Sequence, residues 1–89
     1  MSCQLCEREV ERLTVHHLIP KERDGRFGPR AEICAACHRQ IHVLFDNDRL
    51  ERELNCLERL RDEPQMRRFL SWIRKQDPQK RVKVRSSRR

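Results

Sequence analysis

Apolar residues recur at helical spacing in the second half of the chain. In the stretch DRLERELNCLERLRD, four leucines lie four and three residues apart with charged residues between them: Leu50, Leu54, Leu57 and Leu60. This pattern predicts an amphipathic helix that begins at Asn47, a residue type favoured as an N-cap. Cys56 falls beside the leucines, and we expect it to be buried as a small apolar residue.

A second apolar stripe follows at similar spacing. It consists of Met66, Phe69, Leu70 and Ile73. Pro64 precedes the stripe and suits the first turn of a helix, whereas the pair Asp77-Pro78 disfavours further helix. We therefore predict a second amphipathic helix from Pro64 to near Asp77.

Shorter patterns occupy the first half. The stretch LTVHHLIP contains β-branched and apolar residues and stops at Pro20, which predicts a short strand. Neighbouring side chains on a strand point to opposite sides, so we expect His16 and His17 to have different tasks. In CHRQIHVLF, His38 and His42 lie four residues apart, and a helix would place both on one face.

The length and composition limit the possible classes of protein. With 89 residues the chain is expected to form one domain whose core is small, so something besides the core must stabilise it. No apolar run approaches the ~18 residues that cross a bilayer, and no apolar stretch follows the N-terminal residues. We therefore expect a soluble, cytoplasmic protein that does not enter a membrane. The chain has five cysteines, and in that reducing compartment we expect the paired ones to bind metal rather than form disulfides.

Four of the cysteines form two CxxC pairs. Cys3 and Cys6 are separated from Cys34 and Cys37 by 27 residues, and four thiolates at such spacings can close a tetrahedral zinc site. If closed, this site has no open coordination position and is therefore structural. It would tie the N-terminus to the middle of the chain and add stability. A mixed site, in which one of the adjacent histidines joins Cys3 and Cys6, is also compatible with the spacing but leaves two thiolates without a metal.

The histidines predict a second metal site. His38 and His42, with one member of the adjacent pair at positions 16 and 17, would supply three neutral nitrogens. Three protein ligands leave coordination positions open, which is the pattern of a catalytic ion. The remaining histidine of the pair would then act as a general base, because its ordinary pKa is close to neutral.

These motifs resemble a known family. HHLIP, a loop, and CAACHRQIH resemble the HNH endonucleases, also called His-Me finger nucleases, in the subgroup braced by a CxxC…CxxC zinc site. The later segments resemble the helical extension of small stand-alone members. The resemblance implies a small α+β fold with a ββα-metal core at about 3–45 and a helical extension at about 47–76. Together these form a nuclease domain at 1–77, followed by a basic tail at 78–89.

The resemblance also implies a role for each histidine. In this family the first residue of the pair binds the metal and the second is the general base. It therefore assigns His16 to the metal and His17 to catalysis. The two helix residues that complete the metal site correspond to His38 and His42.

The loop between the histidine pairs departs from the family's pattern. The family's middle Asn falls on Pro29, and no Asn lies between His17 and His38. Because that Asn generally braces the loop, we expect Pro20 and Pro29 to stiffen it instead.

The implied activity is metal-dependent hydrolysis of DNA phosphodiester bonds, by nicking or double-strand cleavage, to 5′-phosphate and 3′-hydroxyl ends. The implied cofactors are the structural Zn²⁺ and one catalytic divalent ion, which could be Mg²⁺, Mn²⁺, Ni²⁺ or Zn²⁺. The expected partner is double-stranded DNA, contacted through its backbone.

The net charge of +7 agrees with such a polyanionic partner. Candidate phosphate contacts in the loop are Lys21, Arg23, Arg26 and Arg30. The tail, which we expect to be disordered without a ligand, adds Lys80, Arg81, Lys83 and Arg85. On charge alone, a tail that only increases solubility is an equal alternative.

Two other functions stay open. The histidines could form a second structural site in a non-catalytic zinc-ribbon protein that binds nucleic acid. Four protein ligands on that ion would indicate such a protein, whereas three would indicate catalysis. The chain could also be the nuclease subunit of a larger complex, bound to a protein partner through the apolar faces of its C-terminal helices.

Overall fold

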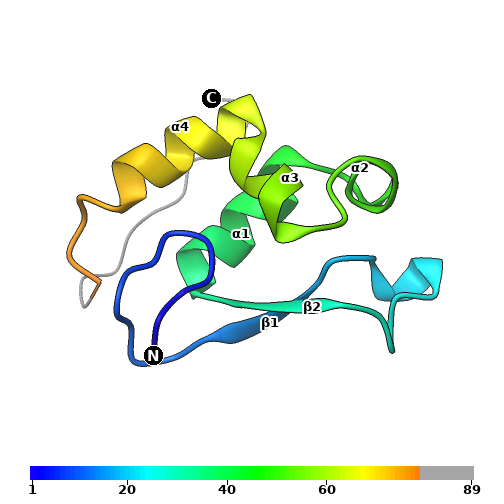
Figure 1. The fold of residues 1–89 in the computed structure, drawn as a ribbon, viewed down its shortest axis with the longest axis horizontal. Coiled ribbons are helices and arrows are strands. Elements are labelled where there is room, and N and C mark those ends of the chain that lie inside the picture. Colours follow the sequence, from blue (N-terminus) through cyan, green and yellow to red (C-terminus); the bar gives the residue numbers. More distant parts are fainter. Residues whose placement is uncertain (79–89) are drawn as a thin grey trace.

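The computed structural model describes residues 1–78, which form a two-stranded antiparallel sheet, a short 3-10 helix and four α-helices (Figure 1). In chain order the elements are β1 (Thr14–His17), η1 (Lys21–Arg23), β2 (Arg30–Ile33), α1 (Ala35–Leu44), α2 (Asn47–Arg52), α3 (Leu57–Asp62) and α4 (Pro64–Ile73). The described part of the chain is therefore a small α+β fold.

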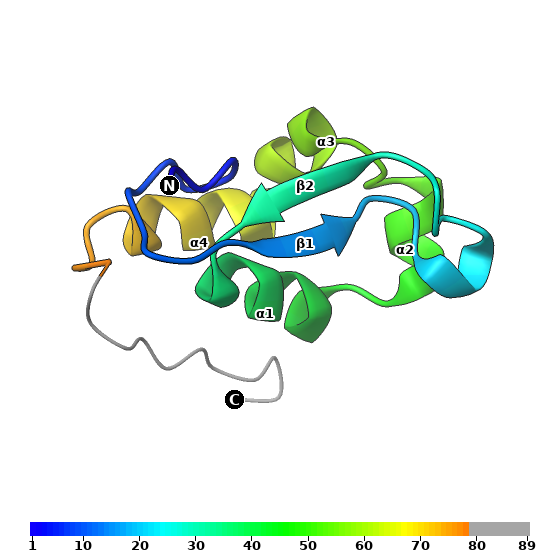
Figure 2. The same ribbon diagram turned by 90° about the horizontal axis from the view of Figure 1, so that it is seen from below.

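The sheet brings the histidine strand beside the helix that carries the other two histidines. β1 and β2 pair antiparallel, with His16 opposite Ala31 and His17 opposite Arg30. β2 leads directly into α1, and α1 packs along β1 while α4 packs against α1 and α3 (Figure 2). The histidines of β1 and α1 therefore meet at one interface between strand and helix.

The core joins the sheet to the helices. Its fully buried apolar side chains include Leu5, Ile33, Ile41, Leu50, Leu60, Met66, Leu70 and Ile73. Cys3, Cys6, Cys34 and Cys37 are buried in the same cluster. The cysteine group is thus part of the core and is shielded from water, which suits a structural role.

Three predicted elements are confirmed. LTVHHLIP contains β1, CHRQIHVLF lies largely in α1, and α4 begins at Pro64 and buries the predicted apolar face. The carboxylate of Glu63 caps α4 by accepting a hydrogen bond from the backbone N–H of Met66 at 2.8 Å. The predicted end is wrong, because α4 stops at Ile73 and is followed by turns before Asp77.

The single helix predicted from Asn47 is also wrong, because the segment forms two short helices. α2 ends at Arg52 and α3 begins at Leu57. Between them, the side-chain amide of Asn55 donates to the backbone carbonyl of Glu51 at 3.0 Å, so a side chain competes for a backbone acceptor. The break still lets Leu50, Leu54 and Leu60 enter the core.

Two residue-level predictions in this segment need correction. The N-cap of α2 is Asp46 rather than Asn47, since the Asp46 carboxylate accepts from the backbone N–H of Arg49 at 2.9 Å. Cys56 is half-buried at the N-cap position of α3 rather than buried in the core. The break between the helices explains why Cys56 is only half-buried, because it moves this residue away from the leucine stripe.

No helix among residues 1–78 is long and apolar enough to span a membrane. The predicted disordered tail, with Lys80, Arg81, Lys83 and Arg85, lies outside the described residues except for its first residue, Pro78.

Candidate metal centres

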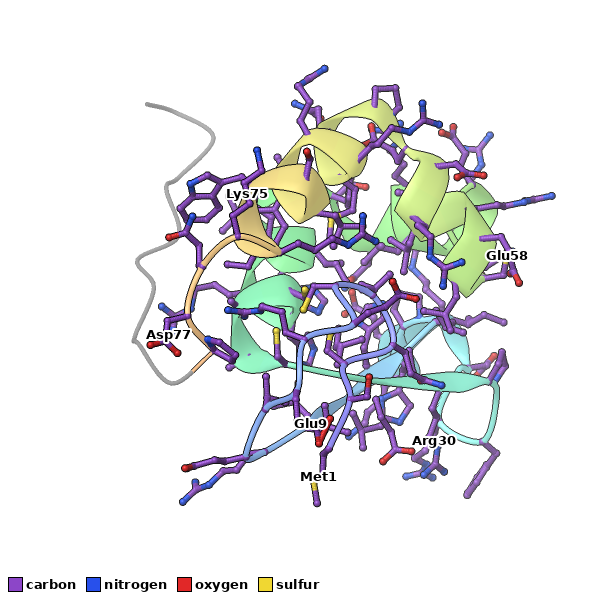
Figure 3. The ribbon with its side chains drawn as sticks, turned by 60° about the vertical axis from the view of Figure 1, so that its left-hand side comes forward. Met1, Glu9, Arg30, Glu58, Lys75 and Asp77 are labelled. Carbon is purple, nitrogen blue, oxygen red and sulfur yellow. The ribbon has the colours of Figure 1, made fainter. Side chains whose placement is uncertain are left out.

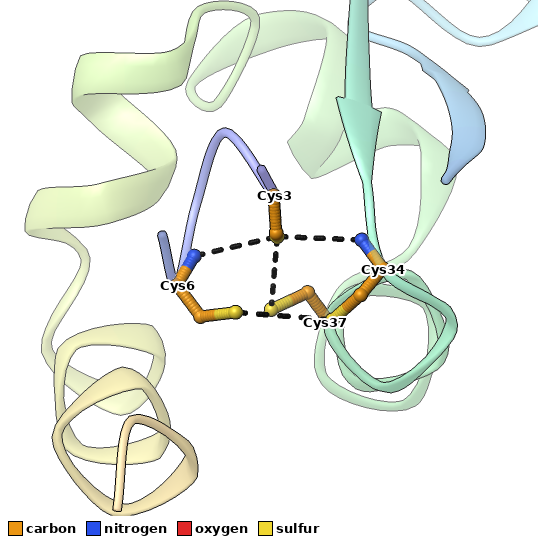
Figure 4. A group of neighbouring side chains, drawn as sticks. All are labelled: Cys3, Cys6, Cys34 and Cys37. Carbon is orange, nitrogen blue, oxygen red and sulfur yellow. Dashed lines mark hydrogen bonds between the residues drawn. The ribbon is translucent and has the colours of Figure 1, made fainter. Parts of the chain in front are cut away.

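Four cysteines from two distant segments meet at the start of α1. Cys3 and Cys6 come from the N-terminal turn, Cys34 is the N-cap of α1, and Cys37 lies in its first turn (Figure 4). The sulfur atoms of Cys3 and Cys37 are 3.8 Å apart, those of Cys6 and Cys34 are 3.9 Å apart, and all four lie within 4.8 Å of one another. A tetrahedron of sulfurs around zinc, with Zn–S of about 2.3 Å, has sulfurs about 3.8 Å apart. The group can therefore bind a structural metal such as zinc, as predicted.

Hydrogen bonds from the backbone and from an arginine stabilise negative charge on the sulfurs. The backbone N–H groups of Cys6 and Cys34 donate to the sulfur of Cys3 at 3.4 and 3.3 Å. The guanidinium of Arg8 donates to the sulfurs of Cys6 and Cys34 at 3.4 and 3.5 Å. Four thiolates around a divalent ion leave two excess negative charges, and Arg8 offsets part of that excess.

The pKa values within the group divide into two pairs. Hydrogen bonding, above all with Cys3, lowers the pKa of Cys6 to about 6 and also lowers the pKa of Cys34. Hydrogen bonding raises the pKa of Cys3, first through Cys34, and of Cys37, first through Cys3. Because thiolates are the form that binds a metal, binding to all four sulfurs would release the protons that the thiols still carry.

Three histidines form a second, separate group. His16 comes from β1, and His38 and His42 come from successive turns of α1. Their ring centroids are 5.1 to 5.4 Å apart, and one nitrogen from each lies within 4.8 Å of the others. The cysteine and histidine groups share no residue. The mixed site considered from spacing alone is therefore not formed.

Thr14 fixes the orientation of His38. Its hydroxyl donates to the backbone carbonyl of Ile33 at 2.9 Å and lies 2.8 Å from Nδ1 of His38. A hydroxyl has one hydrogen, so it accepts from Nδ1–H of His38, and the lone pair is then on Nε2 of that ring. Metal-ligating histidines commonly donate from the ring nitrogen that does not bind the ion, and this hydrogen bond fixes the orientation of the ring.

The burial of His16 leaves one nitrogen without a partner. His16 is 2% exposed, and its Nε2 atom is buried with no hydrogen bond among the described residues. Burial, followed by the positive charges that His38 and His42 would carry, lowers the pKa of His16 to about 4. Burial also lowers the pKa values of His38 and His42. All three rings are therefore held in the neutral form that binds a metal, and an ion would satisfy the unpaired nitrogen of His16.

His17 lies on the other side of β1 from His16 but borders the same pocket. This pocket has a volume of about 420 Å³ and is lined by Val15, His16, His17, Pro20, Lys21, Glu22, His38, His42 and Asn47. Partial burial of the ring, followed by the positive charges of Lys21 and Arg30, lowers the pKa of His17. A neutral imidazole at the edge of a water-accessible pocket can accept a proton.

The loop cations take different positions. Lys21 lines the pocket, and Arg30 lies across the sheet from His17. Arg23 instead forms ion pairs with Asp48 at 3.6 Å and Glu51 at 2.9 Å, so it ties η1 to α2. Arg26 lies over the ring of Phe27, with its guanidinium carbon 5.2 Å from the ring centroid.

Comparison with known proteins places the chain among its relatives. It is 48% identical over 85 residues to the uncharacterized protein YisB of Bacillus subtilis (strain 168). The aligned region covers 96% of this chain and 85% of YisB. The chain belongs to the YisB family. No family model matches the chain, and no solved structure gives a significant match.

Sequence reasoning missed the residues that support the two groups in this YisB-family chain. Arg8, Thr14 and Asn47 carry no spacing signal, although Thr14 lies two positions before His16 and hence on the same face of the strand. Asn47 lines the histidine pocket and donates from its side-chain amide to the carboxylate of Glu22. That contact braces η1 from α2, although the spacing around Asn47 indicated only a helix cap.

Proposed function

We propose that this protein is a metal-dependent HNH endonuclease that hydrolyses DNA phosphodiester bonds to 5′-phosphate and 3′-hydroxyl ends. One observation carries the proposal. Three histidines, of which His16 is buried, His38 half-buried and His42 exposed, converge on a point in a pocket that His17 also lines. The order β1, β2, α1, with the histidines on the first strand and the helix, agrees with the ββα-metal core expected of that family.

The number of ligands favours catalysis over a second structural site. Three histidines make up the group, and no carboxylate or thiolate of residues 1–78 lies close enough to join them. Glu22 borders the pocket, but its carboxylate accepts from the amide of Asn47. A tetrahedral or octahedral ion would therefore keep at least one position for water or a phosphate oxygen.

The residues divide the reaction between them. A divalent ion at the histidine group would supply Lewis-acid polarisation of a phosphate oxygen and stabilise the negative charge of the departing 3′ oxygen. His17 removes the proton from the attacking water as the new P–O bond forms and the P–O3′ bond breaks. Lys21 and Arg30 attract the phosphate to the pocket and stabilise its growing negative charge.

Incubation with supercoiled plasmid tests the proposal. The purified protein is given Mg²⁺, Mn²⁺, Ni²⁺ or Zn²⁺, and nicked and linear DNA are separated by gel electrophoresis. We expect nicking with at least one ion, followed by ligation of the products without prior treatment, because DNA ligase requires 5′-phosphate and 3′-hydroxyl ends. Gln40→Ala, between the two histidines of α1, is the matched control and should retain activity.

His38→Ala should abolish cleavage in the same assay, since it removes a coordinate bond. Activity that persists in His38→Ala, or cleavage by no ion at all, would contradict the proposal. Retained DNA binding without cleavage would instead indicate the non-catalytic zinc-ribbon protein.

A further inference from the structure

Phe27 is the most exposed large apolar side chain of residues 1–78, with 87% of its surface accessible to solvent. It lies between η1 and β2, in the loop that projects past the end of the sheet beside α2 (Figures 1 and 2). One exposed apolar residue needs no explanation by itself. Phe27, however, lies on a turn fixed by hydrogen bonds and has positively charged residues nearby, and both features suit a binding surface.

The turn that carries Phe27 is held by hydrogen bonds. The backbone N–H of Gly25 donates to the carbonyl of Pro20 at 3.0 Å, and that of Gly28 donates to the carbonyl of Gly25 at 3.0 Å. At the base of the turn, the N–H of Leu18 donates to the carbonyl of Pro29 at 3.1 Å. An aromatic ring on a fixed backbone loses little conformational entropy when it binds a partner.

One cation lies against the ring, and two more lie beside the histidine pocket. The guanidinium of Arg26 lies over Phe27, Arg30 follows at the start of β2 opposite His17, and Lys21 lines the pocket. We name Lys21, Arg26, Phe27 and Arg30 the basic tip. Glu22 and Asp24 are the acidic residues of this turn. Arg30 of this tip lies on the opposite side of the view from Lys75 and Asp77 (Figure 3).

An aromatic ring beside arginines can contact both the phosphates and the bases of a nucleic acid. Phosphates pair with the cations, and a base can stack on the ring. To stack on a fully paired duplex, the ring must first separate two base pairs, which costs a few kcal/mol. A bulged, flipped or unpaired base already exposes its face, so that cost is absent.

We propose that Phe27 stacks on an unstacked base beside the phosphate held at the histidine pocket, so that the protein prefers DNA with a bulged or unpaired base. This inference rests on the proposed function, because it names the class of DNA that the same site receives. Arg26 and Arg30 hold the adjoining phosphates, and Phe27 supplies the preference.

Fluorescence binding assays test the preference. All variants carry His17→Ala, so the DNA stays intact whether or not the wild-type protein cleaves it. The two probes are a duplex with a single bulged 2-aminopurine and the same duplex fully paired. We expect the parent to bind the bulged probe roughly tenfold more tightly and to quench its fluorescence by stacking.

Phe27→Ala should lose both the preference and the quenching while binding the paired probe as before. Phe27→Trp should keep both, because it retains an aromatic face. Trp72→Ala is the matched control, since it removes another exposed aromatic residue from α4, and it should behave as the parent.

A preference that persists in Phe27→Ala would overturn the inference, as would equal weakening of both probes. A change confined to self-association, measured by sedimentation, would assign Phe27 to a protein contact and would overturn it too. Failure of the nuclease proposal is seen separately. Wild-type protein would then leave plasmid uncut, while the Phe27-dependent preference for the bulged probe would remain.

Discussion

Thr14 makes two hydrogen bonds that fix the ring of His38 before any ion binds. Its hydroxyl donates to Ile33 and accepts from Nδ1 of His38. At the scale of single residues, the histidine group thus depends on a side chain that is not itself a ligand. The burial of His16 acts in the same direction, because it keeps that ring neutral and leaves its Nε2 unpaired.

Thr14→Val should weaken ion binding at the histidine group about 10- to 100-fold, because the ring of His38 loses the partner that sets its tautomer. Thr14→Ser retains the hydroxyl and should bind as the wild type does. Calorimetric titration with Mn²⁺ or Ni²⁺ measures both affinities. Equal affinity of Thr14→Val and wild type would remove Thr14 from the site.

The ligands themselves could be predicted from spacing, because a metal needs several donors and short motifs such as CxxC and H-x3-H supply them in pairs. Their supporting residues could not. Arg8 donates to Cys34 across 26 positions of the chain and to the carbonyl of Gln76 across 68. Contacts of that separation exist only after the chain has folded, and Arg8 is otherwise an ordinary surface cation.

At the scale of elements, the loop between β1 and β2 positions residues of the pocket. The backbone of this loop can fold back on itself only because residue 25 is a glycine. A Cβ atom at Gly25 would lie 1.7 Å from the backbone oxygen of Ile19. The corresponding closest approach at Gly28 is 3.4 Å, to the oxygen of Gly25. Gly25 is therefore required by close packing of two backbone segments, whereas Gly28 has room for a methyl group.

Gly25→Ala should displace the loop that carries Lys21 and slow plasmid cleavage at least tenfold, since small shifts of positioning groups have effects of that size. Gly28→Ala is the matched control and should stay near wild-type activity. Elemental analysis should find zinc in both, because the cysteine group lies outside the loop. Wild-type cleavage by Gly25→Ala would show that the loop does not position the reaction.

Element types were easier to predict from this sequence than element lengths. The β-branched and apolar residues of LTVHHLIP, which end at a proline, and the heavily apolar face after Pro64 each favoured one structure, and both formed. The leucine spacing after residue 46 fitted one long helix as well as it fitted two short ones. There, the hydrogen bond of Asn55 to Glu51 and the packing of Leu54 into the core favoured two short helices.

At the scale of the whole molecule, the cysteine group joins segments that the small core alone holds weakly. It links the N-terminal turn to α1, and Arg74 of the C-terminal region donates to the carbonyls of Cys6 and Leu5 at 3.3 Å each. The N-terminal turn is thus fixed from both sides. The fold that positions β1 beside α1, and with it the histidine pocket, therefore depends on this group.

Cys34→Ser should lose zinc and unfold the first half of the chain, because closed thiolate sites contribute on the order of 10 kcal/mol, comparable with the whole stability of a small domain. Cys56→Ser is the matched control. Cys56 lies outside the group at the N-cap of α3, where serine is favoured, so zinc and melting temperature should be retained. A wild-type melting temperature in Cys34→Ser would show that the group is not the structural support.

The central claim is that the histidine pocket separates ion binding from proton removal. Its most direct test measures plasmid nicking and calorimetric Mn²⁺ or Ni²⁺ binding on one preparation of His17→Ala, beside wild type and His42→Ala. We expect His17→Ala to bind the ion like wild type and to nick at least 100-fold more slowly, since general-base catalysis contributes about 10²–10⁴-fold. His42→Ala should lose both ion binding and nicking. Loss of ion affinity in His17→Ala equal to that in His42→Ala, or wild-type nicking by His17→Ala, would contradict the account.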